Sequence, residues 1–291
     1  MPKDVVLWSL LNVLIVILTS CSHSSGKNRG YSTENEQLSV ENSITIIGQP
    51  DTDGNDSLII KDSSDSFIIC KPAPLYHISE QIIEKSSYIV SYNRDTKCPN
   101  WVAWQLTAKH TDGELKRMNN FHEEEDVPEP RAMLQDYRGS GWSRGHMCPA
   151  GDNKWDREAM YDSFSLVNVC PQNSKLNSGL WNSIEMDCRK WARKYGEVYI
   201  VCGPVFLNRE HETIGENDVF VPEAFFKVIL RLTSEPSAIG FVVRNNEGKK
   251  KKDQFVNTVD DIERITGIDF FPALPDDIEN VVESTANLKD W

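Results

Sequence analysis

The chain has 291 residues, 39% of them hydrophobic, and a formal net charge of −13. This length fits one sizeable domain with appendages, and the hydrophobic content is sufficient for a buried core. The acidic total excludes a large basic surface. Residues 131–200, however, hold ten basic and eight acidic side chains, so the middle of the chain is locally basic and can steer an anionic ligand.

The first 21 residues have the pattern of an export signal. The run VVLWSLLNVLIVILTSC is apolar, and Asn12 interrupts it. It is also shorter than a membrane-spanning helix, which usually needs about 20 apolar residues. Its end, LTSC, resembles a bacterial lipobox, which predicts a lipid on Cys21 after cleavage. An uncleaved anchor is the alternative, because only Lys3 supplies positive side-chain charge before the run. Both interpretations predict an exported, membrane-tethered protein of the cell envelope, facing the periplasm or the cell surface.

Residues 22–75 have the composition of a polar tether that is largely disordered. Ser, Asn, Asp, Gly and Glu dominate this segment, and few apolar residues are available for a core. Two short β-like runs, SITIIG and SLII, indicate that part of it is ordered. The chain is thus divided into a signal peptide (1–21), a tether (22–75) and a folded domain (76–291).

The folded domain is predicted to contain more strands than helices. β-Branched and aromatic runs predict strands, and runs of helix formers that end at a glycine predict helices. A polar loop, residues 120–142, separates the second predicted strand from the third. Because strands and helices do not alternate regularly, we predict an α+β fold with a mixed or antiparallel sheet. The predicted strands are SSYIVSY, NWVAWQLT, residues 164–169, GEVYIVCGPVF, FFKVILRL and AIGFVV, and the predicted helices are residues 177–195 and NTVDDIERITG.

Six cysteines remain after Cys21. In an exported protein they predict up to three disulfides, whose pairing the sequence leaves open. A zinc site is the weaker alternative, because no C-x-x-C pair is present. The six are Cys70, Cys98, Cys148, Cys170, Cys188 and Cys202.

Two neighbouring segments carry the residue types of a hydrolytic site. In SRGHMCPAGD, His146 follows Arg144 by two residues, so both side chains face one side of a strand. On the following predicted helix, Asn177 lies two turns before Glu185, and Arg189 lies one turn after it. Oxygen ligands suit a hard cation such as Mg²⁺, arginine suits a phosphate, and histidine can accept a proton at neutral pH. The set predicts phosphodiester hydrolysis, with His146 as general base and one metal on Asn177.

Each of these residues also has an ordinary interpretation. Glu185 and Arg189 fit a helix-surface pair worth about 0.3–0.5 kcal/mol. Asn177 fits a helix cap, and an isolated histidine is commonly a satisfied polar residue. The residues alone therefore leave the choice open.

The order of several blocks along the chain favours the catalytic interpretation. SRGHMCPAGD, SLVNVCPQ, LNSGLWNSIEMDCR and VYIVCGPVF are similar to the successive blocks of the DNA/RNA non-specific endonuclease family, and the similarity extends from about residue 88 to residue 291. The resemblance implies a ββα-metal core. It also implies a sugar-non-specific enzyme that cleaves DNA and RNA with one Mg²⁺, for which Mn²⁺ is the alternative ion.

The resemblance also implies roles for single residues. His146 corresponds to the general base, Asn177 to the direct metal ligand, and Glu185 to the residue that holds a metal-bound water. Arg144 and Arg189 correspond to phosphate contacts.

The resemblance gives weaker support for the roles of two further residues, and the chain differs from the family motif at one position. Asn168 corresponds to a residue that helps to position the site, and Arg117 matches a further substrate-binding arginine through a looser alignment. The family motif begins with Asp where this chain has Ser143, which brings no negative charge. This departure favours, as one alternative, a catalytically weak nucleic-acid-binding lipoprotein. A phosphodiesterase for small substrates is the other alternative. The sequence does not determine the oligomeric state or the preference for DNA or RNA.

Overall fold

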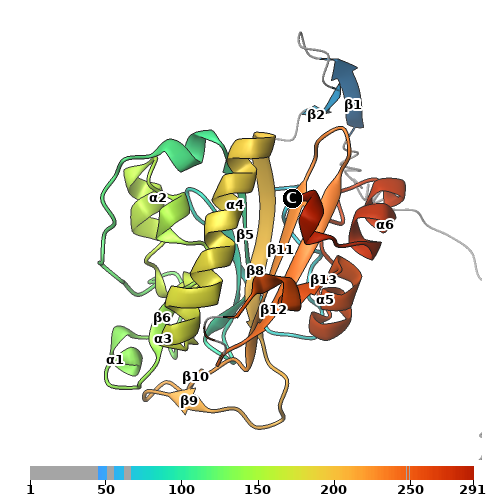
Figure 1. Cartoon of the computed structure of the whole chain (residues 1–291). Coiled ribbons are helices and arrows are strands. Elements are labelled where there is room, and N and C mark those ends of the chain that lie inside the picture. The colour runs from blue at the N-terminus through green and yellow to red at the C-terminus, as the bar shows by residue number, and fades with distance from the viewer. Residues whose placement is uncertain (1–44, 51–55, 62–66, 247, 249) are drawn as a thin grey trace, which may run out of the picture. The chain divides into compact units, whose positions relative to one another are not determined.

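The computed structural model describes residues 45–50, 56–61, 67–246, 248 and 250–291, and its centre is a seven-stranded sheet in which every pair of neighbours is antiparallel (Figure 1). The strand order is β13-β12-β11-β8-β5-β4-β3. The α+β prediction with an antiparallel sheet is confirmed, and β3 and β13 are additions that the sequence patterns did not predict. The strands are β3 (Gln81–Glu84), β4 (Ile89–Asn93), β5 (Cys98–Thr107), β8 (Glu197–Val205), β11 (Ala224–Arg231), β12 (Ser237–Arg244) and β13 (Val256–Asn257).

Side chains of the central strands alternate between two cores, one on each face of the sheet. In β8, Ile200 and Cys202 pack into the core that α4 covers, whereas Tyr199 and Val201 pack into the core that α5 and α6 cover (Figure 1). Burial on both faces explains the continuous apolar runs, because such a strand has no water-facing side that requires polar residues. The helices longer than one turn are α1 (Leu134–Tyr137), α2 (Arg157–Asp162), α4 (Asn182–Tyr195), α5 (Val259–Thr266) and α6 (Asp276–Ser284).

The helix ends follow the expected capping chemistry. α4 stops before Gly196, whose φ is +90°, and α5 stops before Gly267, whose φ is +71°. The Thr258 side chain accepts a hydrogen bond from the Asp261 amide and begins α5. No helix in the described ranges is long and apolar enough to cross a bilayer. The shorter turns are α3 (Ser174–Leu176) and the 3₁₀ turns η1 (Lys109–Asp112), η2 (Ala150–Asp152), η3 (Leu166–Asn168), η5 (Lys252–Phe255) and η6 (Leu288–Asp290).

A second, two-stranded antiparallel sheet leads into α4 and completes a ββα unit. It consists of β6 (Ser143–His146) and β7 (Val169–Gln172). The strand predicted at residues 164–169 is displaced, because residues 166–168 form the turn η3 and β7 continues through Pro171. Proline is tolerated there because β7 is an edge strand that pairs only with β6.

The helix predicted over residues 177–195 is not continuous. Its first part, η4 (Asn177–Trp181), is a wide π turn, and Gly179 has non-helical dihedral angles of φ −106° and ψ −107°. Regular helix begins at Asn182. A glycine accommodates this break because it lacks the Cβ that restricts other residues.

The six cysteines that follow Cys21 are all buried, and none of them forms a disulfide in the described structure. The predicted disulfides are therefore wrong here. The thiols fill the cores as small apolar side chains, and Cys202 Sγ donates a hydrogen bond to the Met147 carbonyl at 3.3 Å.

The packed domain extends to the N-terminal side of Tyr76, its predicted start. Ile69 and Cys70 belong to the core beneath α5 and α6. The two β-like runs of the tether form the antiparallel hairpin of β1 (Thr45–Pro50) and β2 (Asp56–Lys61). The predicted signal peptide, including Cys21, lies outside the described residues. A third small pair is β9 (Thr213–Ile214) with β10 (Val219–Phe220).

Candidate active site

His146 lies at the end of β6, between two phenylalanine rings. Its ring centroid is 5.1 Å from that of Phe121 and 4.9 Å from that of Phe164. The side chain is 6% exposed, and Nε2 is enclosed without a hydrogen-bond partner among the described residues. The Trp181 indole donates to the His146 carbonyl at 3.4 Å, which joins β6 to the start of α4.

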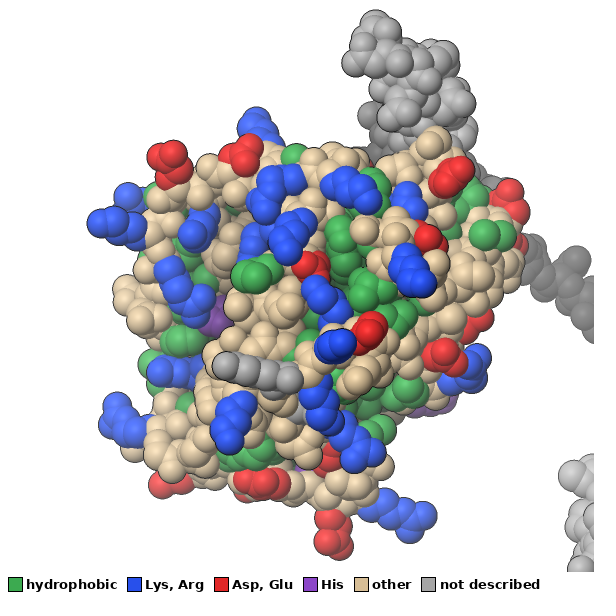
Figure 2. Space-filling view, viewed as in Figure 1, with side chains coloured by type: hydrophobic (Ala, Val, Ile, Leu, Met, Phe, Trp, Pro, Cys, Tyr) green, Lys and Arg blue, Asp and Glu red, His purple; other side chains and the backbone are tan. Residues whose placement is uncertain are grey.

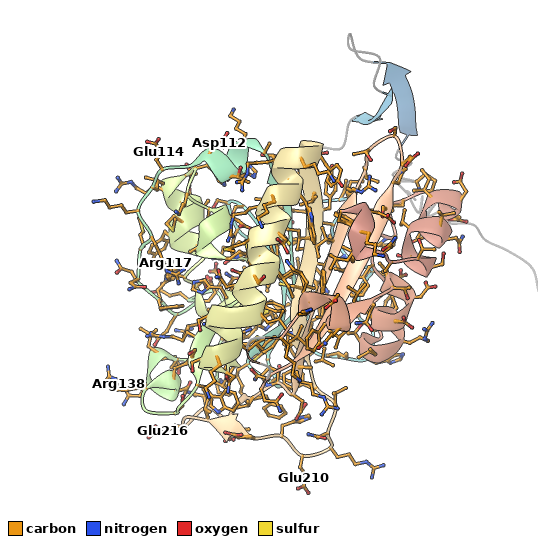
Figure 3. All side chains as sticks on the ribbon, viewed as in Figure 1. Asp112, Glu114, Arg117, Arg138, Glu210 and Glu216 are labelled. Carbon is orange, nitrogen blue, oxygen red and sulfur yellow. The ribbon has the colours of Figure 1, made fainter. Side chains whose placement is uncertain are left out.

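Two arginines approach the same rings. The Arg144 guanidinium carbon lies 4.3 Å from the centroid of Phe121, and that of Arg117 lies 5.3 Å from the centroid of Phe164. Arg117 is on the same side of α4 as α2 (Figure 3). The structure thus brings Arg117 and Arg144 to His146, although Arg117 lies 26 positions before Ser143, the first residue of β6.

This environment keeps the His146 imidazole neutral. Burial, together with the smaller effect of the positive charges of Arg117 and Arg144, lowers the pKa of His146 to about 3. A neutral imidazole has a lone pair that can accept a proton at physiological pH. An anion bound to the two arginines would offset their charge and make His146 a stronger base.

Asn168 braces the turn that follows His146. Its Nδ2 donates to the carbonyls of Cys148 and Ser163, at 2.8 Å each, and its Oδ1 accepts from the Cys148 amide at 2.8 Å. The Asn168 carbonyl also accepts from the Met147 amide at 2.9 Å. The side chain is fully buried, so it positions the site and is not free to bind a ligand.

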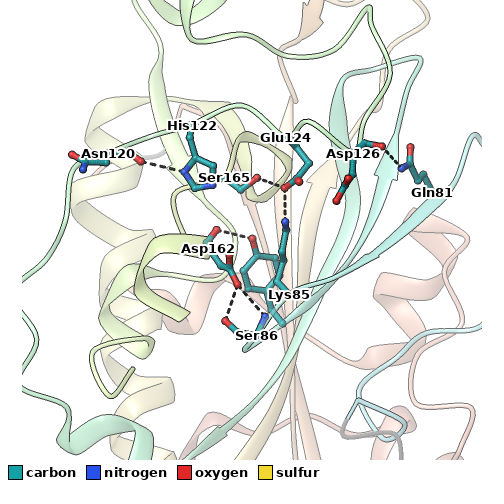
Figure 4. A network of polar contacts seen from close by, with 10 residues as sticks. Gln81, Lys85, Ser86, Asn120, His122, Glu124, Asp126, Asp162 and Ser165 are labelled. Atoms are coloured by element: carbon teal, nitrogen blue, oxygen red, sulfur yellow. Dashed lines mark hydrogen bonds and ion pairs between the residues drawn. The ribbon is translucent and has the colours of Figure 1, made fainter. Parts of the chain in front are cut away.

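A polar network fixes the segment that carries Phe121, one of the two phenylalanines beside His146 (Figure 4). The His122 amide donates to the Phe164 carbonyl at 3.1 Å, which ties both flanking segments together. Nearby, the buried carboxylate of Glu124 pairs with Lys85 at 2.7 Å and accepts from the Ser165 hydroxyl at 2.8 Å. These contacts hold the ring pair around the histidine.

The break before α4 improves the alignment of Asn177 with Glu185. Eight residues of regular α-helix would leave the two side chains about 80° apart around the axis. A π turn takes up about one additional residue, which reduces this offset to roughly 20°. Both side chains are half-buried. The Asn177 backbone amide donates to the Asn173 carbonyl at 2.9 Å, whereas its side-chain amide makes no hydrogen bond within the described part of the chain.

Arg189 is held by an aspartate that the sequence interpretation missed. Its Nη1 donates to Asp152 Oδ1 at 2.7 Å, and the Trp104 indole donates to Asp152 Oδ2 at 3.2 Å. A Cβ on Gly151 would lie 2.8 Å from the same Nη1, so the glycine makes room for the guanidinium. Asp152 is the last residue of the SRGHMCPAGD block, which was the one available signal.

Lys227 is a second missed residue, and it lies beneath the site. It is 1% exposed, and its Nζ lies 4.8 Å and 4.7 Å from the rings of Trp104 and Trp181. Its signal was a lysine in the apolar strand AFFKVILR, on the same face as Phe225 and Ile229.

The charge of Lys227 acts on the Glu185 carboxyl. Burial raises the pKa of Glu185 to about 7, while Lys227 and, to a smaller extent, Arg189 oppose the rise. Glu185 therefore lies at the balance between its neutral and ionised forms near neutral pH. A bound cation would favour the carboxylate.

The other two residues of β6, Ser143 and Gly145, point away from the site. Ser143 and Gly145 face the side opposite to Arg144 and His146, since side chains alternate along a strand. A Cβ on Gly145 would lie 2.3 Å from Gln172 Oε1, so only glycine allows this close approach of β6 and β7. Ser143 is half-buried and adds no carboxylate near the histidine.

Basic side chains gather on the face that α4 covers, whereas acidic side chains lie mainly toward its rim (Figure 2). Lys190, Arg193 and Lys194 are exposed on α4 itself. The local surplus of positive charge expected from the sequence is therefore present at the surface around the site, despite the acidic total.

Known nucleases are similar to this chain in sequence and in fold. Mitochondrial nuclease EXOG of Mus musculus is 37% identical over 216 residues, which cover 67% of this chain and 59% of that protein. Nuclease C1 of Cunninghamella echinulata var. echinulata is 34% identical over 213 residues, which cover 67% of this chain and 84% of that protein. The crystal structure of the EndoG/EndoGI complex matches with a TM-score of 0.65 and 28% identity, over 68% of this chain and 89% of the matched chain.

The match has a defined extent. The chain spans about three fifths of the length of the EXOG nucleases of mouse and human, 59% and 62%. The sequence pattern of the DNA/RNA non-specific endonucleases fits residues 67–277, which contain all of β3 to β13, α4 and the residues around His146. The chain has a ββα-metal nuclease fold and belongs to the DNA/RNA non-specific endonuclease family.

Proposed function

We propose that this protein is a metal-dependent endonuclease that hydrolyses phosphodiester bonds of DNA and RNA without sequence preference. The observation that carries the proposal is the neutral, enclosed His146 with the guanidinium groups of Arg117 and Arg144 beside it, next to a helix that carries Asn177 and Glu185. The ββα unit, the η4 turn that leads into α4 and the segment that carries Arg117 thereby supply a proton acceptor, phosphate-binding cations and oxygen ligands.

The side chains at the start of α4 fit a hard divalent cation. Asn177 offers an amide oxygen that no described residue uses, and Glu185 offers a carboxyl at the point of ionisation. We infer one Mg²⁺, with Mn²⁺ as the alternative ion, held directly by Asn177 and through water by Glu185. Such an ion supplies Lewis-acid stabilisation of negative charge on the phosphate and the leaving oxygen.

His146 supplies the base. Because Nε2 is enclosed by protein, we expect Nδ1 to take the proton of the attacking water. The phenylalanine rings exclude water from most of the imidazole, and the Asn168 brace fixes the turn that follows it. The proton can leave again once the phosphate dissociates, because the arginines then lower the pKa of His146 once more.

The arginines bind the phosphate and do not recognise individual bases. Arg144, Arg117 and the Asp152-oriented Arg189 offer charge-assisted donors that suit phosphate oxygens. Contacts to phosphates carry no sequence information, and they weaken as salt is added. We therefore expect broad cleavage patterns on a defined duplex that fade with ionic strength.

The test is digestion of plasmid DNA and of a long RNA by the full-length protein, with Mg²⁺ and with a chelator. Cleavage of both polymers that the chelator abolishes supports the proposal. Turnover of a chromogenic diester without cleavage of either polymer would indicate a phosphodiesterase for small substrates. Nucleic-acid binding without metal-dependent turnover would indicate the catalytically weak binding protein instead.

We further propose that residues 1–21 export the chain and that Cys21 anchors it through a lipid to the cell envelope. The lipobox-like LTSC sequence supports this proposal. Incorporation of labelled palmitate into the wild-type chain, and its loss in Cys21→Ala, would be the expected result. Equal labelling of both proteins would contradict it.

A further inference from the structure

Three carboxyl groups converge between α5 and α6, on the face of the sheet opposite to α4. Asp260 and Glu263 belong to α5, Glu283 belongs to α6, and one oxygen of each lies within 4.8 Å of the others. The buried side chains of both helices pack into the core that α4 does not share (Figure 1). The group is therefore separate from the site around His146.

Glu283 is the member that points to a ligand. It is 7% exposed, and its Oε1 has no hydrogen-bond partner among the described residues. It also lies one residue before the end of α6, where the negative end of the helix dipole disfavours a carboxylate. Ionising a carboxyl in this place is costly, and a bound cation would offset that cost.

No cationic side chain of the described residues supplies that partner. No ion pair joins Asp260, Glu263 or Glu283 to a lysine, arginine or histidine of the described residues, and the nearby Arg264 pairs with Asp261 instead. Burial, followed by Glu263 and Glu279, raises the pKa of Glu283 to about 9. This raised pKa is the result expected when several acidic groups lie close together and repel one another.

We propose that Asp260, Glu263 and Glu283 bind a divalent cation and that the ion is Ca²⁺. Calcium bonds to oxygen at about 2.3–2.6 Å, so two of its ligand oxygens lie at most about 5 Å apart, as these three do. Several carboxylates on one ion favour Ca²⁺ over Mg²⁺, which commonly takes one or two and keeps its waters.

The surroundings suit such an ion. The Phe270 amide donates to Glu263 Oε1 at 2.8 Å, which fixes that carboxylate and leaves its second oxygen for the cation. An open hollow of about 390 Å³ is lined by Asp260 and Glu263, together with Asp269 and the Asp261-paired Arg264, and it gives these two carboxylates access from solvent. The bound ion joins α5 to α6 and stabilises the second core.

The experiment measures the thermal unfolding of the chelator-treated full-length protein while CaCl₂ alone is added. A hundredfold excess over the dissociation constant is expected to raise the Tm by roughly 5–10 °C. Glu283→Gln and Asp260→Asn each remove one ligand charge and should abolish most of this rise. Asp277→Asn removes the same charge from an exposed position of α6 and should keep it.

Asn177→Ala separates this site from the catalytic one. It lacks the proposed catalytic metal ligand and should still show the full calcium-dependent rise, whatever its nuclease activity. Without calcium, Glu283→Gln should unfold at or above the wild-type temperature, because it no longer buries a carboxyl among acids. The absence of a calcium effect in the wild type would overturn the proposal. A rise that Glu283→Gln and Asp260→Asn retain, or that Asn177→Ala alone abolishes, would overturn it equally.

Discussion

Replacing Asn168 by Asp tests whether the turn after His146 depends on one amide. The Asn168 side chain donates to two carbonyls and accepts from one amide, all at 2.8 Å and fully buried. Asp has almost the same shape and keeps the acceptor. It replaces the donor with an oxygen that faces the carbonyls of Cys148 and Ser163.

The expected loss of stability is large. Two buried carbonyls lose their donor, at about 1–3 kcal/mol each, and an ionised carboxylate there would cost more. We therefore expect Asn168→Asp to lower the free energy of unfolding by about 3–5 kcal/mol at pH 8. The protonated acid can donate to one carbonyl, so the folded state raises the pKa of this Asp. A raised folded-state pKa makes the loss smallest at acid pH and larger as the pH rises above about 4.

Asn173→Asp is the matched control. Asn173 Oδ1 caps α3 by accepting from the amides of Lys175 and Leu176, and a carboxylate can do the same. Its effect should stay within about 0.5 kcal/mol at either pH.

Urea unfolding of both variants and the wild type, at pH 5 and pH 8, measures these differences. The Asn168 variant should also lose nuclease activity without a change in the Mg²⁺ concentration needed, since Asn168 holds no metal. Equal stability of the two variants at pH 8, or an Asn168→Asp penalty that shrinks as the pH rises, would refute the assignment of Asn168 as a brace.

Three further results are expected. Because folding lowers the pKa of His146 to about 3, this histidine binds a proton mainly in the unfolded chain. Lowering the pH from 7 to 5 should therefore reduce the free energy of unfolding of the wild type by about 2 kcal/mol more than that of His146→Ala, as measured by urea titration. Gly151→Ala should slow plasmid cleavage by roughly tenfold or more, because the added Cβ displaces the Arg189 guanidinium, and unchanged initial rates would contradict this. The six buried cysteines should resist alkylation in the native protein and react fully in denaturant without reductant, so that mass spectrometry finding fewer than six would restore the disulfide interpretation.

The sequence predicted the main strands and the common side of Arg144 and His146, because both are encoded locally. The strand runs have lengths and compositions that only a sheet buried on both faces accommodates, and β8, β11 and β12 lie within two residues of their predicted ends. Arg144 and His146 meet one phenylalanine ring because their i, i+2 spacing puts them on one side of β6.

Longer-range features could not be read in the same way. The oxidation state was predicted from cysteine number and presumed compartment, whereas the thiols prove to be core side chains. The break at Gly179 lies within a run that otherwise has a helical pattern, so the pattern alone predicts a continuous helix. The pairing of Arg189 with Asp152 and the burial of Lys227 join segments far apart in the chain, and only the fold brings them together.

The central claim is that His146 is the base and Asn177 the metal ligand of a nuclease. The most direct measurement is the single-turnover cleavage rate of plasmid DNA as Mg²⁺ is varied, for the wild type, His146→Ala and Asn177→Ala, with circular dichroism to verify folding. We predict that His146→Ala lowers the rate at saturating Mg²⁺ by about 10²–10⁴-fold with an unchanged Mg²⁺ midpoint. Asn177→Ala should instead shift the midpoint to higher Mg²⁺. Wild-type rates in folded His146→Ala would contradict the mechanism.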